Sequence, residues 1–401
     1  MTLSIPRPGP LNNIQVLDFT RLFPGPCCTR ILADLGARVI KIEDTEGGDY
    51  FRWMGPPVSR AGCAGFNYLN RGKHSLVIDL KAAGARQVID PLLSRADVLI
   101  EGFRPGVMAK FGLDHASVLK DHPKLVYASI TGYGQDGPLA DRAGHDVNYM
   151  ALAGMYRLDE DSTRVLPTQL ADLLGGGQTT ATAILAALVE VKSGGSGRFL
   201  DISMTQAVQS LAGIHFAEVM SETRPPEGEH DILGGMNPGY AIYACRDKTH
   251  LAVAALEPKF WIRLTRALGI DDLPVPMMEP AKNWPPIRER LQEALLSRTA
   301  SEWAEFLGPH DCCVEPVLTP REALDHPQAQ ARGVGIPVST GDGTQLLQPA
   351  PVVHGVPDIP KPDHAAPRYG QHTREILQEI GLDRKIIDEL LQSAVVVAEK
   401  A

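Results

Sequence analysis

Short apolar runs alternate with amphipathic stretches through the first half of the chain, and this pattern constrains the fold more than any other feature. Five runs read as strands, IQVLDF, ARVIKIE, SLVIDL, DVLIEGF and KLVYASITGYG, and segments such as CCTRILADLG and AAGARQVIDPLLSRA between them read as helices. Strands that are apolar along their whole length are typical of a parallel sheet with helices on both faces. The pattern therefore predicts an α/β fold.

The regular alternation ends near residue 222, where the sequence becomes rich in proline, glycine and charge. A hairpin-like pair, YAIYACRD and HLAVAAL, is followed by three helical segments, which together predict a smaller α+β domain. A proline-rich stretch then leads to two terminal helices, TREILQEIGL and KIIDELLQSAV. We expect a large domain beginning at 1–222, a linker at 223–239, a small domain at 240–330, a return linker at 331–368, and helices at 369–401 that complete the large domain.

Composition excludes several classes of partner. The 401 residues carry a net charge of -9, whereas a general nucleic-acid binder needs a broad excess of Lys and Arg. No run of about eighteen apolar residues is present and the first residues lack the pattern of a secretory signal, so we expect a cytoplasmic protein without a membrane span. None of the six cysteines has the spacing of a zinc site or a secreted disulfide framework. We expect reduced, structural cysteines and no bound metal.

The stretch after the first predicted strand argues against the common nucleotide-dependent enzymes. It reads TRLFPGPCCTR, which contains neither G-x-G-x-x-G nor the lysine of a phosphate loop. The chain also lacks the G-x-S-x-G of a serine hydrolase and the H-E-x-x-H of a zinc protease. The chemistry therefore depends on other residues.

Basic residues cluster at the ends of several predicted strands: Lys41, Arg71, Lys73, Arg104 and Lys110. Ligands of open α/β sheets bind outside the carboxyl ends of the strands, and phosphate-rich ligands need charged donors there. The arrangement favours a polyphosphate handle such as that of CoA. The alternative is that each of these side chains only solvates the surface.

Four titratable residues, at three places in the chain, stand out against apolar surroundings. In RAGHDVNYMALAG, His145 and Asp146 form an adjacent imidazole and carboxylate, although Asp146 could cap the following helix and His145 could be an ordinary surface histidine. Asp172 opens an apolar, glycine-spaced segment, where it could be a helix N-cap. Glu257 precedes a proline at a strand-to-helix junction, where it could be a first-turn glutamate favoured by the helix dipole.

Nine motifs occur along the chain in a recognisable order: RLFPGP, LADLGARVIKIE, RGKHSLVIDLK, ADVLIEGFRPGVMAKFGL, ITGYGQDGP, AGHDVNYMALAG, ADLLGGG, AALEPKFW and VEPVLTPREALDHPQAQARG. With them the chain resembles the class III CoA-transferases over about residues 15–350, and most closely the α-methylacyl-CoA racemase branch. The resemblance implies a homodimer of two interlocked chains. Each chain would have a large Rossmann-like domain and a small domain, joined by two long linkers.

The resemblance also implies roles for single residues. In the racemases, a histidine and an aspartate lie on either side of the α-carbon of an acyl-CoA, and a glutamate orients the histidine. The matching residues of this chain are His145, Asp172 and Glu257. The backbone N–H of Asp146 would hold the thioester oxygen. In the transferases, Asp172 would instead be a nucleophile that forms an acyl anhydride. We expect CoA to be bound by Lys41, Arg71, Lys73, Asp79, Leu80, Gly102, Phe103, Arg104, Lys110, Asn148 and Tyr149.

The chemistry of a thioester explains why such a set is needed. Its α-proton is a very weak acid, so inversion needs a base on one face, an acid on the other and a stabilised enolate oxygen. We predict a racemase of 2-methylacyl-CoA thioesters, with CoA entering as part of the substrate and no separate cofactor. Two alternatives stay open: a class III CoA-transferase acting through Asp172, and a non-catalytic protein that binds CoA thioesters without turnover.

Overall fold

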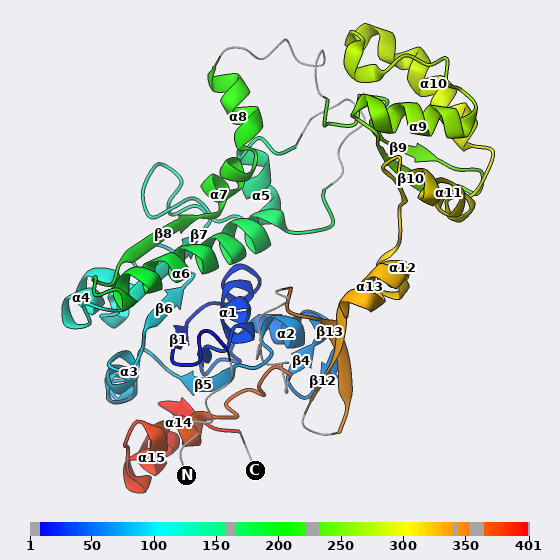
Figure 1. The fold of residues 1–401 in the computed structure, drawn as a ribbon. Coiled ribbons are helices and arrows are strands. Elements are labelled where there is room, and N and C mark those ends of the chain that lie inside the picture. The colour runs from blue at the N-terminus through cyan, green and yellow to red at the C-terminus, as the bar shows by residue number, and fades with distance from the viewer. Residues whose placement is uncertain (1–8, 157–164, 222–231, 341–342, 353–364, 400–401) are drawn as a thin grey trace. The chain divides into compact units, whose positions relative to one another are not determined.

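The computed structural model describes residues 9–156, 165–221, 232–340, 343–352 and 365–399 (Figure 1). The chain divides into two units, one formed by Met1–Phe216 with Gly333–Ala401 and the other by Ala217–Arg332. The second unit is therefore an insertion in the first. Parts of both predicted linkers, residues 223–231 and 353–364, lie outside the described residues.

A seven-stranded sheet forms the centre of the first unit. Its strands are β1 (Gln15–Asp18), β2 (Arg38–Glu43), β5 (His74–Ile78), β6 (Val98–Glu101), β7 (Val126–Thr131), β8 (Phe199–Ser203) and β14 (Val396–Val397). They lie in the order β14-β5-β2-β1-β6-β7-β8, and all neighbours are parallel except β14, which pairs antiparallel with β5. The α/β fold with a parallel sheet is confirmed.

Both faces of this sheet are covered, because successive strand residues point to opposite sides. Val16 and Val98 belong to one buried apolar cluster, and their neighbours Leu17 and Leu99 belong to another. This double burial is why the strands are apolar along their whole length. The helices up to residue 220 and after residue 370 are α1 (Pro24–Asp34), α2 (Ala64–Leu69), α3 (Ala85–Leu93), α4 (His115–Asp121), α5 (Asp146–Leu152), α6 (Thr179–Lys192), α7 (Met204–Leu211), α8 (Gly213–Met220), α14 (Thr373–Glu379) and α15 (Arg384–Gln392).

The second unit has a sheet of three antiparallel strands, β9 (Tyr240–Ala244), β10 (His250–Ala254) and β11 (Val314–Pro316), in the order β11-β10-β9. Its core cluster surrounds the fully buried Trp261. The hairpin and the three helices that the sequence predicts are present. Its helices are α9 (Pro258–Leu268), α10 (Trp284–Leu295), α11 (Ala300–Leu307), α12 (Pro320–Asp325) and α13 (Pro327–Arg332).

Two segments differ from the sequence prediction. The expected return linker contains an antiparallel hairpin of β12 (Gly335–Ser339) and β13 (Gln345–Pro349), since proline is tolerated in a ribbon that has only edge strands. The helix expected over DLLGGGQTTATAILAALVEVKSG begins as a π-helix, Ala171–Gln178, before α6. The remaining short elements are η1 (Tyr50–Trp53), β3 (Pro57–Ser59), β4 (Gly62–Cys63), η2 (Met108–Phe111), η4 (Pro276–Met278), η5 (Ala281–Asn283) and η6 (Gly308–His310).

Candidate active site

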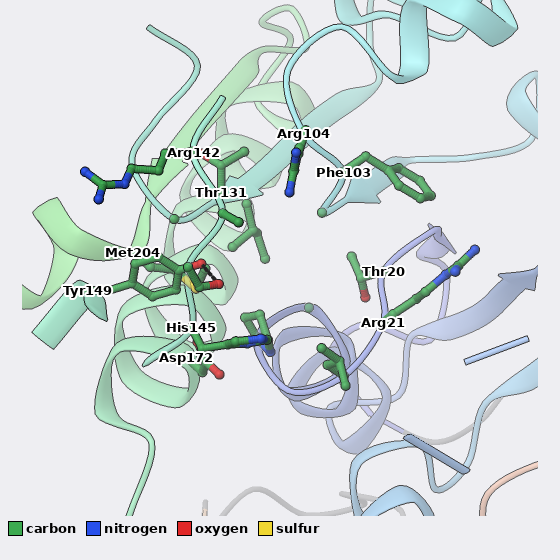
Figure 2. A pocket seen from close by; sticks show the side chains of 18 of the residues that line it. Thr20, Arg21, Phe103, Arg104, Thr131, Arg142, His145, Tyr149, Asp172 and Met204 are labelled. Atoms are coloured by element: carbon green, nitrogen blue, oxygen red, sulfur yellow. Dashed lines mark hydrogen bonds between the residues drawn. The ribbon is translucent and has the colours of Figure 1, made fainter. Parts of the chain in front are cut away.

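A cavity of about 570 Å³ lies at the carboxyl ends of β1, β6 and β7, where an open α/β sheet binds its ligands. Its walls are formed by residues from the segments 19–25, 102–105, 130–132 and 142–145. His145 and Asp172 both line it, although 26 residues of chain separate the start of α5 from Asp172 (Figure 2). The fold thus brings together the two residues that the sequence singles out for proton transfer.

His145 is held by its own turn. It is the N-cap of α5, and its backbone N–H donates to Oδ1 of Asn148 at 3.0 Å. The hydroxyl of the buried Tyr149 donates to the carbonyl of Gly144, the residue before the histidine. Asn148 and Tyr149 also line the cavity, so these two expected CoA contacts shape the histidine turn as well.

Two glycines, Gly132 directly after β7 and Gly144 directly before the histidine, make room for the ring of Tyr149. A Cβ at Gly132 would lie 2.3 Å from Cε1 of Tyr149, and a Cβ at Gly144 would lie 2.6 Å from the same atom. The ring of Tyr149 also meets that of Tyr133 edge-on, with centroids 5.2 Å apart. The glycine before His145 is therefore required by packing and not by turn geometry alone.

Asp172 is buried in the cavity wall, with 7% of its surface exposed. It is the second residue of the π-helix and not its N-cap, so the capping interpretation is wrong. Its backbone N–H donates to Oδ1 of Asp146 at 3.1 Å. Burial, and after it the charge of Asp146, raise the pKa of Asp172 to about 7. The carboxyl group can therefore both donate and accept a proton near neutral pH.

The glycine run after Asp172 lets the π-helix pack closely on α1. A Cβ at Gly176 would lie 2.6 Å from Cβ of Pro24, and one at Gly177 would lie 2.8 Å from Sγ of Cys27. Because glycine permits this contact, the first turn of the π-helix faces the cavity beside α1. ADLLGGG is thus a packing motif as well as the carrier of a carboxylate.

Glu257 belongs to the second unit, whereas His145 belongs to the first. It is the N-cap of α9, directly after β10, and its side chain is exposed. After burial, its charge is the next cause that raises the pKa of Cys313. The prediction that Glu257 orients His145 stays a prediction.

The structure gives three of the expected phosphate ligands a different environment. Lys41, Arg71 and Lys73 are buried and do not line the cavity; they form ion pairs with Asp49 at 2.9 Å, Asp34 at 2.7 Å and Asp18 at 3.2 Å. Lys41 lies within β2, and Arg71 and Lys73 lie just before β5, so these three do not follow strands; they are counter-ions of buried aspartates. A direct contact with a CoA phosphate would first have to break these pairs.

Other predicted CoA residues divide between the cavity and the surface. Gly102, Phe103 and Arg104 line the cavity, and the side chain of Arg104 has no ion pair or hydrogen bond among the described residues. Asp79 and Leu80 do not line it: the carboxylate of Asp79 accepts the N–H of Lys81 at 2.9 Å, and Leu80 packs on the sheet core. Lys110 is exposed on η2, away from the cavity lining.

Sequence analysis missed several lining residues. Arg21, directly after β1, reaches Asp44 at 2.6 Å and lies over the ring of Phe103. Tyr50 comes from η1, and Arg142 stands three residues before His145. Only their closeness to strand ends or to the histidine motif could have indicated them.

The described part of the chain shows neither a metal site nor a membrane-spanning helix. No group of three or more His, Cys, Asp or Glu side chains in it is arranged to hold a metal ion. Likewise, no helix among these residues combines the length and apolar character needed to span a bilayer.

Comparison with known proteins gives consistent results. A model of CoA-transferase family III matches residues 11–373. The chain is 35% identical over 396 residues to alpha-methylacyl-CoA racemase of Mus musculus. The aligned region covers 97% of this chain and 98% of the relative. The chain is also 31% identical over 383 residues to acetyl-CoA:oxalate CoA-transferase of Acetobacter aceti, covering 92% and 96%. A crystal structure of a CaiB/BaiF family protein from Brucella suis matches with a TM-score of 0.79 at 26% identity, over 93% of this chain and 100% of that one.

Proposed function

The chain belongs to CoA-transferase family III, whose enzymes include racemases and CoA-transferases, and on that premise we propose that it is a racemase of 2-methylacyl-CoA thioesters. The observation that carries the proposal is the pairing of His145 with a buried Asp172 whose pKa is about 7, both on one cavity. Inversion requires a base on one face of the α-carbon and an acid on the other, and these two residues can supply them. The substrate brings CoA with it, and we propose no separate cofactor and a cytoplasmic location.

The proposed reaction has two steps. For one enantiomer, His145 takes the α-proton and the electron pair of the C–H bond moves into the thioester, which becomes an enolate. The protonated Asp172 then delivers its proton to the opposite face of the α-carbon, and the carbonyl re-forms. For the other enantiomer the two residues exchange roles. A backbone donor at the oxygen, the N–H of Asp146, could lower the barrier by roughly 3–4 kcal/mol.

The environment of Asp172 favours proton transfer over nucleophilic attack. A nucleophilic carboxylate has to be ionised, and nearby cations would keep it so. Asp172 instead has a neighbouring carboxylate, Asp146, and no ion pair among the described residues. The raised pKa of Asp172 favours the protonated carboxyl group that inversion needs.

The second candidate is a CoA-transferase that forms an acyl anhydride at Asp172, and the 31% identity to a CoA-transferase favours keeping it. Incubating a 2-methylacyl-CoA in deuterated water, without any acceptor acid, separates the two. A racemase deuterates the α-carbon and gives no acyl-enzyme that hydroxylamine can trap. Transfer of CoA to an added acid without α-deuteration, together with an adduct at Asp172, would establish the transferase.

The family resemblance adds two parts to the proposal. Glu257 would orient His145, so that Glu257→Ala lowers kcat less than His145→Ala does. The protein would also be an interlocked homodimer, which would cover apolar side chains such as Ile214 and Met220, now 73% and 79% exposed on α8. A stable monomer in sedimentation at micromolar concentration would contradict the dimer.

For CoA itself, Arg104 is the basic residue that we propose as a phosphate ligand. It lines the cavity without an ion pair among the described residues, and Figure 2 shows its side chain turned toward the hollow. Arg104→Ala should therefore raise KM for the thioester more than it changes kcat.

A further inference from the structure

A row of polar side chains, buried at Glu101 and Ser129 and exposed at Asp201, crosses three strands beneath the cavity loops. Strand register aligns Glu101 at the end of β6 with Ser129 on β7, and Ser129 with Asp201 on β8. Glu101 is 5% exposed and forms no ion pair among the described residues. The proposed proton transfers do not use this carboxylate, so its burial needs another explanation.

Hydrogen bonds connect the row to both loops that border the cavity. One oxygen of Glu101 accepts the N–H of Phe103 at 2.7 Å, and the other accepts the hydroxyl of Ser129. Ser129 in turn accepts Nε2 of Gln135 at 2.7 Å, and the N–H of Gln135 donates to Asp201 at 3.1 Å. This series of hydrogen bonds thus joins the loop after β6, with its cavity residues 102–105, to the loop after β7.

We propose that Glu101 is a positioning residue that fixes the spacing of these two loops through Ser129 and Gln135 and so sets the affinity of the cavity for CoA. This rests on the proposed acyl-CoA ligand but not on which reaction follows. Because Arg104 stands directly after Phe103, the hydrogen bond that the Phe103 N–H donates to Glu101 determines where that loop presents its guanidinium. The effect of Glu101 is therefore on binding and not on the proton-transfer steps.

The ionised form of Glu101 fits this hydrogen-bond pattern, since both carboxylate oxygens accept. Protonation turns one oxygen into a donor, which the N–H of Phe103 cannot accept and which Ser129 can accept only if its hydroxyl gives up the bond that it donates. Burial raises the pKa of Glu101 to about 7, with the facing carboxylate of Asp201 as a smaller cause, while the bonds from Ser129 and Phe103 oppose the rise. The other titratable group facing it is Tyr127 on β7, whose hydroxyl donates to the carbonyl of Leu113. CoA affinity should therefore fall as the pH drops through neutrality.

Calorimetric titration of the full-length protein with CoA, at pH 6 and pH 8, tests this without any turnover. Glu101→Gln keeps the shape of the side chain but cannot accept on both atoms. We expect it to bind CoA about fivefold more weakly than wild type at pH 8, the effect of one lost hydrogen bond, and equally well at pH 6. Ionisation of the CoA phosphates is common to both proteins, so it cancels in the comparison.

Two further variants separate positioning from general damage. Gln135→Ala removes the half-buried side chain that donates to Ser129, at the far end of this series of hydrogen bonds. The variant should weaken CoA binding at both pH values and keep the pH dependence of wild type. Glu389→Gln, an exposed glutamate on α15, should change nothing. Equal loss at pH 6 and pH 8 in Glu101→Gln, or wild-type affinity in Gln135→Ala, would overturn the inference alone. Absence of CoA binding by wild type would overturn the proposed function with it.

Discussion

Two sets of buried carboxylates lie close to the same strand ends and behave in opposite ways. Asp18, at the end of β1, is buried with Lys73 and Lys41 beside it, whereas Asp172 and Glu101 are buried without an ion pair among the described residues. Burial alone would raise the pKa of Asp18, but the charges of Lys73 and Lys41 and two threonine hydroxyls outweigh it and lower that pKa. For Asp172 and Glu101, burial raises the pKa to about 7. Charge compensation, and not burial, separates the two sets.

The compensated set supports a loop. Nζ of Lys41 donates to the carbonyl of Thr20 at 2.8 Å, and Oδ1 of Asp49 accepts the N–H of Leu22 at 3.2 Å. Leu22 has a φ of 63°, a left-handed conformation that costs free energy in a branched residue, so the loop depends on these contacts. Because the loop forms one wall of the cavity, the ion pairs shape the site from behind, while Asp172 lines the cavity itself.

Removing a compensating cation should give the largest effect. Lys73→Met keeps the volume but leaves Asp18 buried without its partner at 3.2 Å, so we expect the free energy of unfolding to fall by about 3–5 kcal/mol. Urea titration followed by circular dichroism measures this. Lys110→Met, at an exposed position on η2, is the matched control and should stay within about 0.5 kcal/mol of wild type. Similar stability of the two variants would remove the contrast.

The pH dependence of stability should differ in sign between the two aspartates. The folded protein holds the Asp172 proton more tightly than the unfolded chain does, so this contribution to stability is complete below the ordinary pKa of 3.8 and is lost as the pH rises through about 7. The free energy of unfolding of Asp172→Asn, taken relative to wild type, should thus rise by about 1–2 kcal/mol between pH 5 and pH 8.

Asp18 is the reference for this comparison of stability at different pH values. Its pKa is lowered, so its contribution is present above 3.8 and is lost as the pH falls through the lowered value. Asp18→Asn should therefore be less stable than wild type at pH 8, opposite to Asp172→Asn. If both substitutions destabilise the protein equally at pH 8, Asp172 is compensated after all.

A smaller effect should come from the residues that hold His145. Tyr149→Phe removes the hydroxyl that donates to the carbonyl of Gly144, so the histidine turn loosens while the ring still fills its place. We expect kcat to fall about tenfold with KM nearly unchanged, since the loss affects the transition state more than substrate binding. Tyr133→Phe removes the hydroxyl of the neighbouring ring and should leave kcat unchanged. An equal loss in both variants would point to packing instead.

Much of this arrangement follows from the sequence, and the remainder does not for a physical reason. The strands and helices follow from periodicity, and the motif resemblance singles out His145 and Asp172, which the structure places on one cavity. The fate of the basic residues does not, because Lys73 meets an aspartate 55 residues away and Arg71 meets one 37 residues away. The local sequence shows a cation near the end of a strand, but it does not show the distant aspartate that pairs with this cation. Glu101 escaped notice for the same reason, since its row exists only in the register of three strands.

The account depends most on His145 and Asp172 acting as two bases on opposite faces of one carbon. Each enantiomer of a 2-methylacyl-CoA, incubated separately in deuterated water and followed by mass spectrometry for α-deuteration, tests this directly. Wild type should deuterate both enantiomers. His145→Ala and Asp172→Asn should each suppress exchange by about 10²–10⁴-fold for one enantiomer, a different one in each variant, and affect the other much less. Equal loss for both enantiomers in both variants, or no deuteration by wild type, would contradict the two-base account.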